Sequence, residues 1–128
     1  MMTFFEDLPP QCPPPDAVDK AFDEVWRVVD GASPSEEHFY SHAKRGWPKR
    51  PTDTDCDHAS CSVFTSRAKI AGLVPKLPKS RIGDPHLVKF AIPEGAGMSI
   101  ENSRSGHVHF WMAAGFTPWQ GTLVVEKP

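Results

Sequence analysis

The sequence predicts an α+β fold, with early helices packed on a largely antiparallel sheet of about five strands. Helical spacing and capping residues occur in the first half of the chain, whereas short apolar segments separated by turn residues fill the second half. A chain of 128 residues with 39% hydrophobic residues is long and apolar enough for one domain with a core. We therefore expect a single domain over residues 16–128.

The residues before this domain form an extended arm. Five of the fourteen prolines fall within residues 9–15, and such a segment favours an extended backbone. We expect this arm to cover residues 1–15 and to stand apart from packed structure.

The segment after the arm permits two interpretations. Asp16 and Gly31 are suitable start and stop residues for an amphipathic helix over residues 17–30. Four apolar residues recur at helical spacing within it: Val18, Phe22, Val25 and Val29. Residues 25–29 are instead largely β-branched or aromatic, which favours a strand. Periodicity leaves both interpretations open.

A second early helix has a clearer start. The sequence Ser-Pro-Ser-Glu at residues 33–36 is a capping box with proline at the first helical position. We expect this helix to run to about Arg45 and to end at Gly46. Residues 47–60 then form a long loop, and long loops in small domains are often functional.

Strands dominate the remaining chain. Alternation and turn residues predict them at residues 61–64, 86–92, 98–101, 107–113 and 122–126. A helix follows the first of these strands, capped by Thr65 or Ser66 and running to Leu73 or Val74, where prolines end it.

The strand at residues 107–113 carries the clearest candidate site. Side chains alternate along a strand, so His107, His109 and Trp111 share one face, while Val108 and Phe110 face the core. Imidazoles titrate near neutral pH and serve as acids or bases in catalysis. We predict a functional site on the face that holds the two histidines.

Composition excludes several classes of protein. The net charge of −2 and the isoelectric point near 6.3 argue against nucleic-acid binding, which needs a basic face. The sequence has no apolar segment of about 18 residues and no secretory signal, so we expect no membrane span. The three cysteines are an odd number, which favours a reducing compartment over a disulfide framework, and we expect a cytoplasmic protein.

Two hydrolase chemistries are open alternatives. Cys56, His58 and Cys61, with His107 and His109, have the donor types that zinc prefers, although they lack the close Cys-x-x-Cys pair of structural zinc motifs. The sequences His-Ala-Ser at residues 58–60 and His-Val-His at 107–109 also resemble the paired motifs of two-histidine phosphoesterases. One imidazole would then act as base and the other as acid.

Three motifs in order resemble a group of small uncharacterised bacterial proteins. They are Trp-Arg-Val-Val at residues 26–29, Ser-Val-Phe-Thr-Ser at 62–66 and Gly-His-Val-His-Phe-Trp at 106–111. The same layout resembles a minimal ADP-ribosyltransferase-like fold. This resemblance implies an ADP-ribosyltransferase-like protein that handles NAD or a related nucleotide in a toxin-related role.

The resemblance assigns roles to individual residues. Arg27 matches the position that holds the dinucleotide, and Ser62, Thr65 and Ser66 match the segment that shapes the nicotinamide pocket. Trp111 would stack on a planar base. The late glutamate that orients the ribose has two candidates, Glu101 and Glu126, and neither lies in the Glu-x-Glu or Gln-x-Glu pattern of that superfamily.

A non-catalytic role is a further alternative. The catalytic set is incomplete, and three aromatic residues fall in segments expected to be exposed loops: Trp47, Phe116 and Trp119. These features suit an immunity or accessory protein that binds a protein partner.

Overall fold

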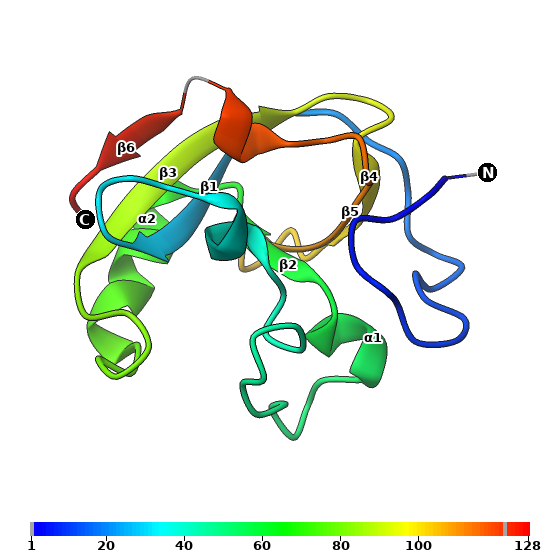
Figure 1. Cartoon of the computed structure of the whole chain (residues 1–128), viewed down its shortest axis with the longest axis horizontal. Coiled ribbons are helices and arrows are strands. Elements are labelled where there is room, and N and C mark those ends of the chain that lie inside the picture. Colours follow the sequence, from blue (N-terminus) through cyan, green and yellow to red (C-terminus); the bar gives the residue numbers. More distant parts are fainter. Residues whose placement is uncertain (1, 122) are drawn as a thin grey trace.

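The computed structural model describes residues 2–121 and 123–128, which form a six-stranded antiparallel sheet with short helices (Figure 1). The strands are β1 (Phe22–Asp30), β2 (Cys61–Phe64), β3 (Pro85–Ile92), β4 (Gly97–Glu101), β5 (His107–Met112) and β6 (Val124–Glu126). Their order across the sheet is β4-β5-β2-β1-β3-β6. Met1 and Thr122, which begin the expected arm and the expected last strand, lie outside the described residues.

The helices are few and short. They are η1 (Glu36–Phe39), α1 (Asp55–His58), α2 (Arg67–Leu73), η2 (Val74–Lys76) and η3 (Pro118–Gln120), where η denotes a 3-10 helix. The mixed helix and strand class is confirmed, but the molecule is mostly sheet and its first regular element is a strand. Within the described ranges, no helix is long and apolar enough to cross a bilayer.

Strand β1 settles the ambiguity at residues 25–29. The segment pairs with β3 from Phe22↔Ile92 to Asp30↔Pro85, so the helical interpretation of residues 17–30 is wrong. Val25 and Val29 are buried in the main core, while Trp26 is buried on the opposite face. A strand can bury β-branched and aromatic residues on both faces, as this one does. With β1 the sheet has six strands, one more than the five that the sequence predicts.

The helix expected from residue 34 to Arg45 is also wrong. Only η1 forms, with Ser35 as its N-cap, and the backbone is already extended at Tyr40. In a longer helix the carbonyl of His38 would accept from the amide of residue 42. Here the guanidinium of Arg27 donates to the His38 carbonyl instead, and Phe39 is buried in the main core. Tertiary contacts therefore override the local helical signal.

The later elements agree closely with the sequence pattern. Ser66 caps α2 by accepting from the amide of Lys69, and the helix ends at Leu73 before Pro75. The expected strands at 61–64, 86–92, 98–101 and 107–113 correspond to β2 through β5 within a residue or two. These segments have local signals strong enough to predict them.

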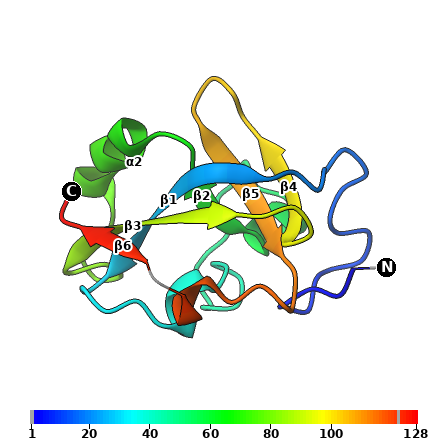
Figure 2. The ribbon, with the colours of Figure 1, turned by 90° about the horizontal axis from the view of Figure 1, so that it is seen from above.

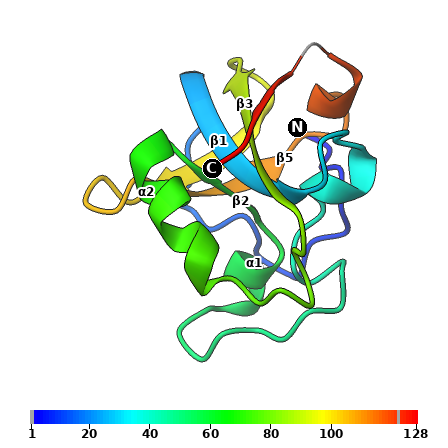
Figure 3. The same cartoon turned by 90° about the vertical axis from the view of Figure 1, so that its left-hand side faces the viewer.

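The two faces of the sheet are covered differently. The main core lies under η1, η3 and the N-terminal segment, where Phe39 contacts Trp119 and Phe110 packs with the valines of the central strands. The opposite face carries α2 over a smaller cluster of Trp26, Ile70 and Leu87. Figures 2 and 3 show α2 on one side of the strands, with η1 in cyan and η3 in orange-red on the other.

The N-terminal arm is fastened to the domain. Cys12 forms a disulfide with Cys56, Phe4 makes a β-bridge to Ala113, and the carboxylate of Glu6 accepts from the amide and hydroxyl of Ser41. The expectation that the cysteines stay reduced is therefore wrong for this pair. The two residues are 44 positions apart, so sequence spacing gave no sign of the pairing.

Removing the disulfide should lower stability without changing the fold. A cross-link that closes a loop of this length stabilises a protein by about 4 kcal/mol in the chain-entropy description, and measured values are commonly about 2–4 kcal/mol. We expect a Cys12→Ser/Cys56→Ser double variant to lose about that much free energy of unfolding in urea denaturation. Reductant should lower the wild-type midpoint and leave the variant unchanged. Equal midpoints for the oxidised wild type and the variant would contradict this prediction.

Candidate functional site

A cavity of about 290 Å³ opens on the sheet face that carries α2. The segment of residues 42–60 forms one wall, and α2 with the residues after it forms the other. Its polar lining comprises four histidines (His42, His58, His107 and His109), four arginines (Arg27, Arg45, Arg50 and Arg81), three aspartates (Asp30, Asp53 and Asp57) and two serines (Ser60 and Ser62). The apolar lining comes mainly from α2 and the residues that follow it.

Arg27 braces the backbone around this cavity. β1 and β2 share a single paired position, Trp26↔Phe64, and Arg27 follows directly. Its guanidinium donates from Nε to the His38 carbonyl (2.7 Å), from Nη1 to the Ser62 carbonyl (2.6 Å) and from Nη2 to the Tyr40 carbonyl (3.0 Å). Arg27 is only 6% exposed. The structure therefore gives this residue a bracing role, with all three nitrogens bonded to backbone.

The two histidines of β5 lie in the cavity with their rings in contact. Their ring centroids are 4.5 Å apart in an edge-to-face arrangement. His107 Nε2 lies 2.6 Å from the hydroxyl of Ser62, and His109 Nδ1 lies 2.8 Å from the hydroxyl of Ser60. Both serines belong to β2 or the residue before it, and β2 pairs directly with β5. The sheet thus fixes the orientation of both rings.

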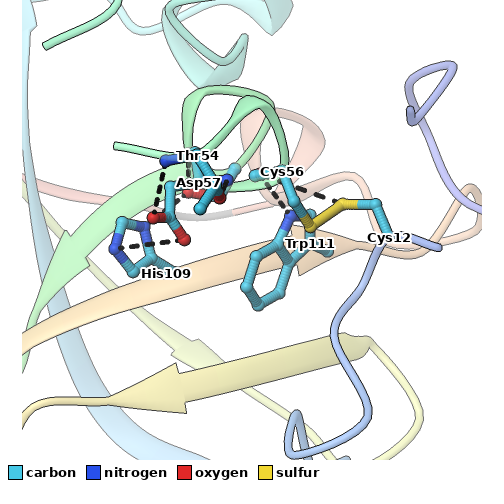
Figure 4. Close-up of a disulfide and its surroundings, with 7 residues drawn as sticks. Cys12, Thr54, Cys56, Asp57, His109 and Trp111 are labelled. Atoms are coloured by element: carbon cyan, nitrogen blue, oxygen red, sulfur yellow. Dashed lines mark hydrogen bonds and ion pairs between the residues drawn. A yellow bond between two sulfur atoms is a disulfide. The ribbon is translucent and has the colours of Figure 1, made fainter. Parts of the chain in front are cut away.

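The hydrogen-bond network assigns the proton on His109. The hydroxyl of Ser60 donates to the backbone carbonyl of Asp57 at 2.6 Å, so it accepts from His109 Nδ1–H. Nε2 of His109 therefore carries the lone pair, and it lies 3.9 Å from Oδ1 of Asp57 (Figure 4). This nitrogen is suited to take a proton from a ligand or a water molecule.

Burial lowers the pKa of three of the imidazoles that line the cavity. Burial, followed by the neighbouring ring of His109, lowers the pKa of His107 to about 4. Burial and then the charge of Arg27 lower the pKa of His42 to about 4. Burial also lowers the pKa of His109, although Asp57 opposes this shift. The imidazoles of His42, His107 and His109 are therefore uncharged at neutral pH.

Trp111 shares the histidine face, as its alternation predicts, but it cannot stack on a ligand. The indole is 1% exposed, and its Nε1 donates to the carbonyl of Cys56 at 2.9 Å. Figure 4 shows it beneath α1, close to the Cys12–Cys56 disulfide. Its ring stacks on His109 at a centroid distance of 6.1 Å. Trp111 thus supports His109 from behind.

Several other expected site residues lie elsewhere. The hydroxyl of Thr65 donates to the Gly106 carbonyl, and Ser66 caps α2. Glu101, at the end of β4, forms an ion pair with Lys20, and Glu126 forms one with Arg67. None of these four lines the cavity. Of the residues that the resemblance assigned, the structure brings Arg27 and Ser62 to the cavity, together with the histidine pair.

The zinc interpretation with cysteine ligands is wrong. Cys56 is consumed in the disulfide, and Cys61 is buried in the main core on the other face of the sheet. His58 bonds through Nε2 to the carbonyl of Trp47. Across residues 2–121 and 123–128, no three His, Cys, Asp or Glu side chains are grouped so that they could hold a metal ion.

The segment of residues 42–50 supplies site residues that the sequence analysis did not assign. His42, Arg45, Trp47 and Arg50 all line the cavity. The available signal for Trp47 and Arg50 was the long loop itself, with its mixture of basic residues and tryptophan, whereas His42 and Arg45 lay in the expected helix. No family model, curated protein or solved structure matches this chain.

Substituting Arg27 should destabilise the whole domain. An Arg27→Met variant leaves three carbonyls without their charged donor, and each such bond contributes about 1.5–3 kcal/mol. We expect the free energy of unfolding in urea to fall by about 3 kcal/mol or more. The control is Arg104→Met, in an exposed turn, which should change stability little. Similar losses for the two variants would contradict the bracing role.

The buried histidines should make stability depend on pH. The pKa of His107 is near 6.5 in the unfolded chain and about 4 in the fold. Between these values the unfolded chain binds more protons, so the free energy of unfolding is full above about pH 6.5 and decreases towards pH 4. We expect His107→Gln to reduce this decrease by on the order of 1 kcal/mol after solvent screening. Parallel pH profiles of the thermal midpoint for wild type and variant would refute this expectation.

Proposed function

We propose that the chain handles a nucleotide, with NAD or a related adenine nucleotide as the ligand of the cavity. The observation that supports this most is the convergence of an apolar wall, arginines and uncharged imidazoles in one cavity. An apolar wall suits a planar base, and guanidinium groups suit phosphate oxygens. The order of motifs that resembles an ADP-ribosyltransferase-like protein agrees with the same class of ligand.

The size of the cavity limits how much of the ligand it holds. Its volume of about 290 Å³ lies at the lower end of ligand pockets, which run from about 300 to 1,000 Å³. We infer that one nucleotide half of a dinucleotide occupies the cavity and that the other half extends out of it. In a chain of net charge −2, four arginines against three aspartates make this lining locally positive.

The proposed reaction is transfer or hydrolysis at the ribose of the nucleotide. Such a reaction develops positive charge on the sugar, which a carboxylate stabilises. Asp57 is the carboxylate beside His109, so we propose Asp57 for the role expected of Glu101 or Glu126. His109, with its free Nε2, would accept the proton of the attacking group.

A histidine-dependent phosphoester hydrolase is the second candidate. Two imidazoles in contact, each held through one nitrogen by a serine hydroxyl, favour it. Transfer or hydrolysis at the ribose releases the free base from the nucleotide, whereas phosphoester hydrolysis leaves the bond between base and sugar intact. The products therefore separate the two candidates.

Other proposals have less support. The partner-protein role depended on exposed aromatic residues, but Phe116 and Trp119 pack against the main core and Trp47 lines the cavity. The bacterial, toxin-related role stays a proposal. So does the cytoplasmic location, and the Cys12–Cys56 disulfide weighs against it because disulfides persist mainly in oxidising compartments.

Ligand binding and turnover test the proposed function. We expect NAD, ADP-ribose or AMP at millimolar concentration to raise the thermal midpoint, because a ligand at about 100 times its Kd adds about 2.7 kcal/mol of stability. Incubation with NAD should release nicotinamide, measured by chromatography. His109→Gln should bind NAD but lose the release, and Asp57→Asn should do the same.

The matched control is Glu101→Gln, which changes a carboxylate outside the cavity and should keep full activity. An unchanged thermal midpoint with all three nucleotides would refute the proposal. Binding without nicotinamide release, but with release of a phosphorylated product, would favour the hydrolase candidate.

A further inference from the structure

Two arginine side chains lie against the indole of Trp47 at one end of the cavity. The guanidinium carbon of Arg45 lies 4.7 Å from the centroid of the indole, and that of Arg81 lies 5.2 Å away. The ring of His42 meets the same indole edge-to-face at 4.9 Å. All four residues line the cavity. Two cations on one indole attract the ring but repel each other.

The backbone holds Trp47 firmly in this position. Its amide donates to the carbonyl of His42 at 2.9 Å, and its carbonyl lies 2.8 Å from Nε2 of His58. The backbone of Trp47 is therefore held at both its amide and its carbonyl, and its indole is the platform beside which both guanidinium groups lie.

These two arginines have donors to spare and, unlike Arg50, no carboxylate partner among the described residues. Arg27 is bonded to three carbonyls, and Arg50 pairs with Asp53. Nε of Arg45 is buried and has no acceptor within the described part of the chain. Its Nη2 donates to the carbonyl of Glu37. Arg81 forms no ion pair with any carboxylate among the described residues.

The charges around the platform are mainly positive. Arg27, Arg50 and Arg81 each lower the pKa of His42, after the larger effect of burial. Burial and then Arg27 lower the pKa of Arg45, whereas Glu37 and Asp30 raise it. Neither carboxylate is an ion-pair partner of Arg45 among the described residues. Asp30 accepts the amide of Asp84. A buried donor without an acceptor, beside an unpaired guanidinium, calls for an anion with several acceptor oxygens.

We propose that Arg45, Trp47 and Arg81 form an anion subsite that binds a phosphate group of the proposed nucleotide. The assignment of that phosphate to a nucleotide rests on the proposed function, whereas the subsite itself rests on the geometry of the three side chains. Guanidinium groups match phosphate oxygens in a bidentate way, and each such charged hydrogen bond is stronger than a neutral one. The base would then lie towards the apolar wall and the sugar towards His107 and His109.

Calorimetric binding of AMP, adenosine and inorganic phosphate tests the subsite. We expect AMP to bind at least about tenfold more tightly than adenosine, and phosphate to compete with AMP. Arg81→Gln should weaken AMP binding about tenfold and leave adenosine binding unchanged. Arg81→Lys keeps the charge without the planar fork, so it should restore only part of the affinity. Arg104→Gln, in an exposed turn, is the control and should change neither ligand.

The outcomes separate the subsite from the proposed function. Equal binding of AMP and adenosine to the wild type would overturn the subsite while leaving nucleotide binding intact. Phosphate binding that Arg81→Gln weakens, without binding of AMP or adenosine, would support the subsite and refute the nucleotide. A loss of adenosine binding in Arg81→Gln equal to the loss of AMP binding would mean that Arg81 shapes the wall, which would overturn its role as a phosphate ligand.

Discussion

The bonds from Arg27 to three backbone carbonyls are the constraint on which the site depends. They join β1 to the carbonyls of His38 and Tyr40 and to β2 at Ser62. A buried guanidinium is costly unless its donors are satisfied, and here backbone oxygens satisfy all three nitrogens. Because the residues after Tyr40 lead directly into the wall that holds His42 and Trp47, this brace sets the distance of that wall from the sheet.

Strand β5 contributes side chains to both faces of the sheet, because successive residues of a strand point to opposite faces. Val108 and Phe110 complete the main core, while His107 and His109 project from the other face into the cavity. A packed core on one face makes the strand rigid, and the serines of the neighbouring strand then fix the rings through their hydroxyls. The histidine pair is therefore held precisely because it stands on the sheet rather than on a loop.

The parts that the sequence predicts are those with local causes. Alternation placed His107 and His109 on one face, and the Ser66 cap located α2, because each signal lies within a few residues. The short η1, the burial of Trp111 under α1 and the Cys12–Cys56 pair have causes 11 to 55 residues away in the chain. Neither hydrophobic periodicity nor a capping residue indicates contacts between residues so far apart in the chain. For the same reason the sequence pattern predicts Trp47 to be exposed in a loop, although in the folded chain it lines the cavity.

The disulfide has a consequence for the integrity of the chain. The 44-position ring between Cys12 and Cys56 encloses β1 and the loop that carries Trp47. A protease that cut one exposed bond of this loop, for example near Arg50, would yield two fragments still joined through sulfur. The nicked molecule would migrate as an intact chain under non-reducing electrophoresis, and both walls of the cavity would stay in one covalent unit.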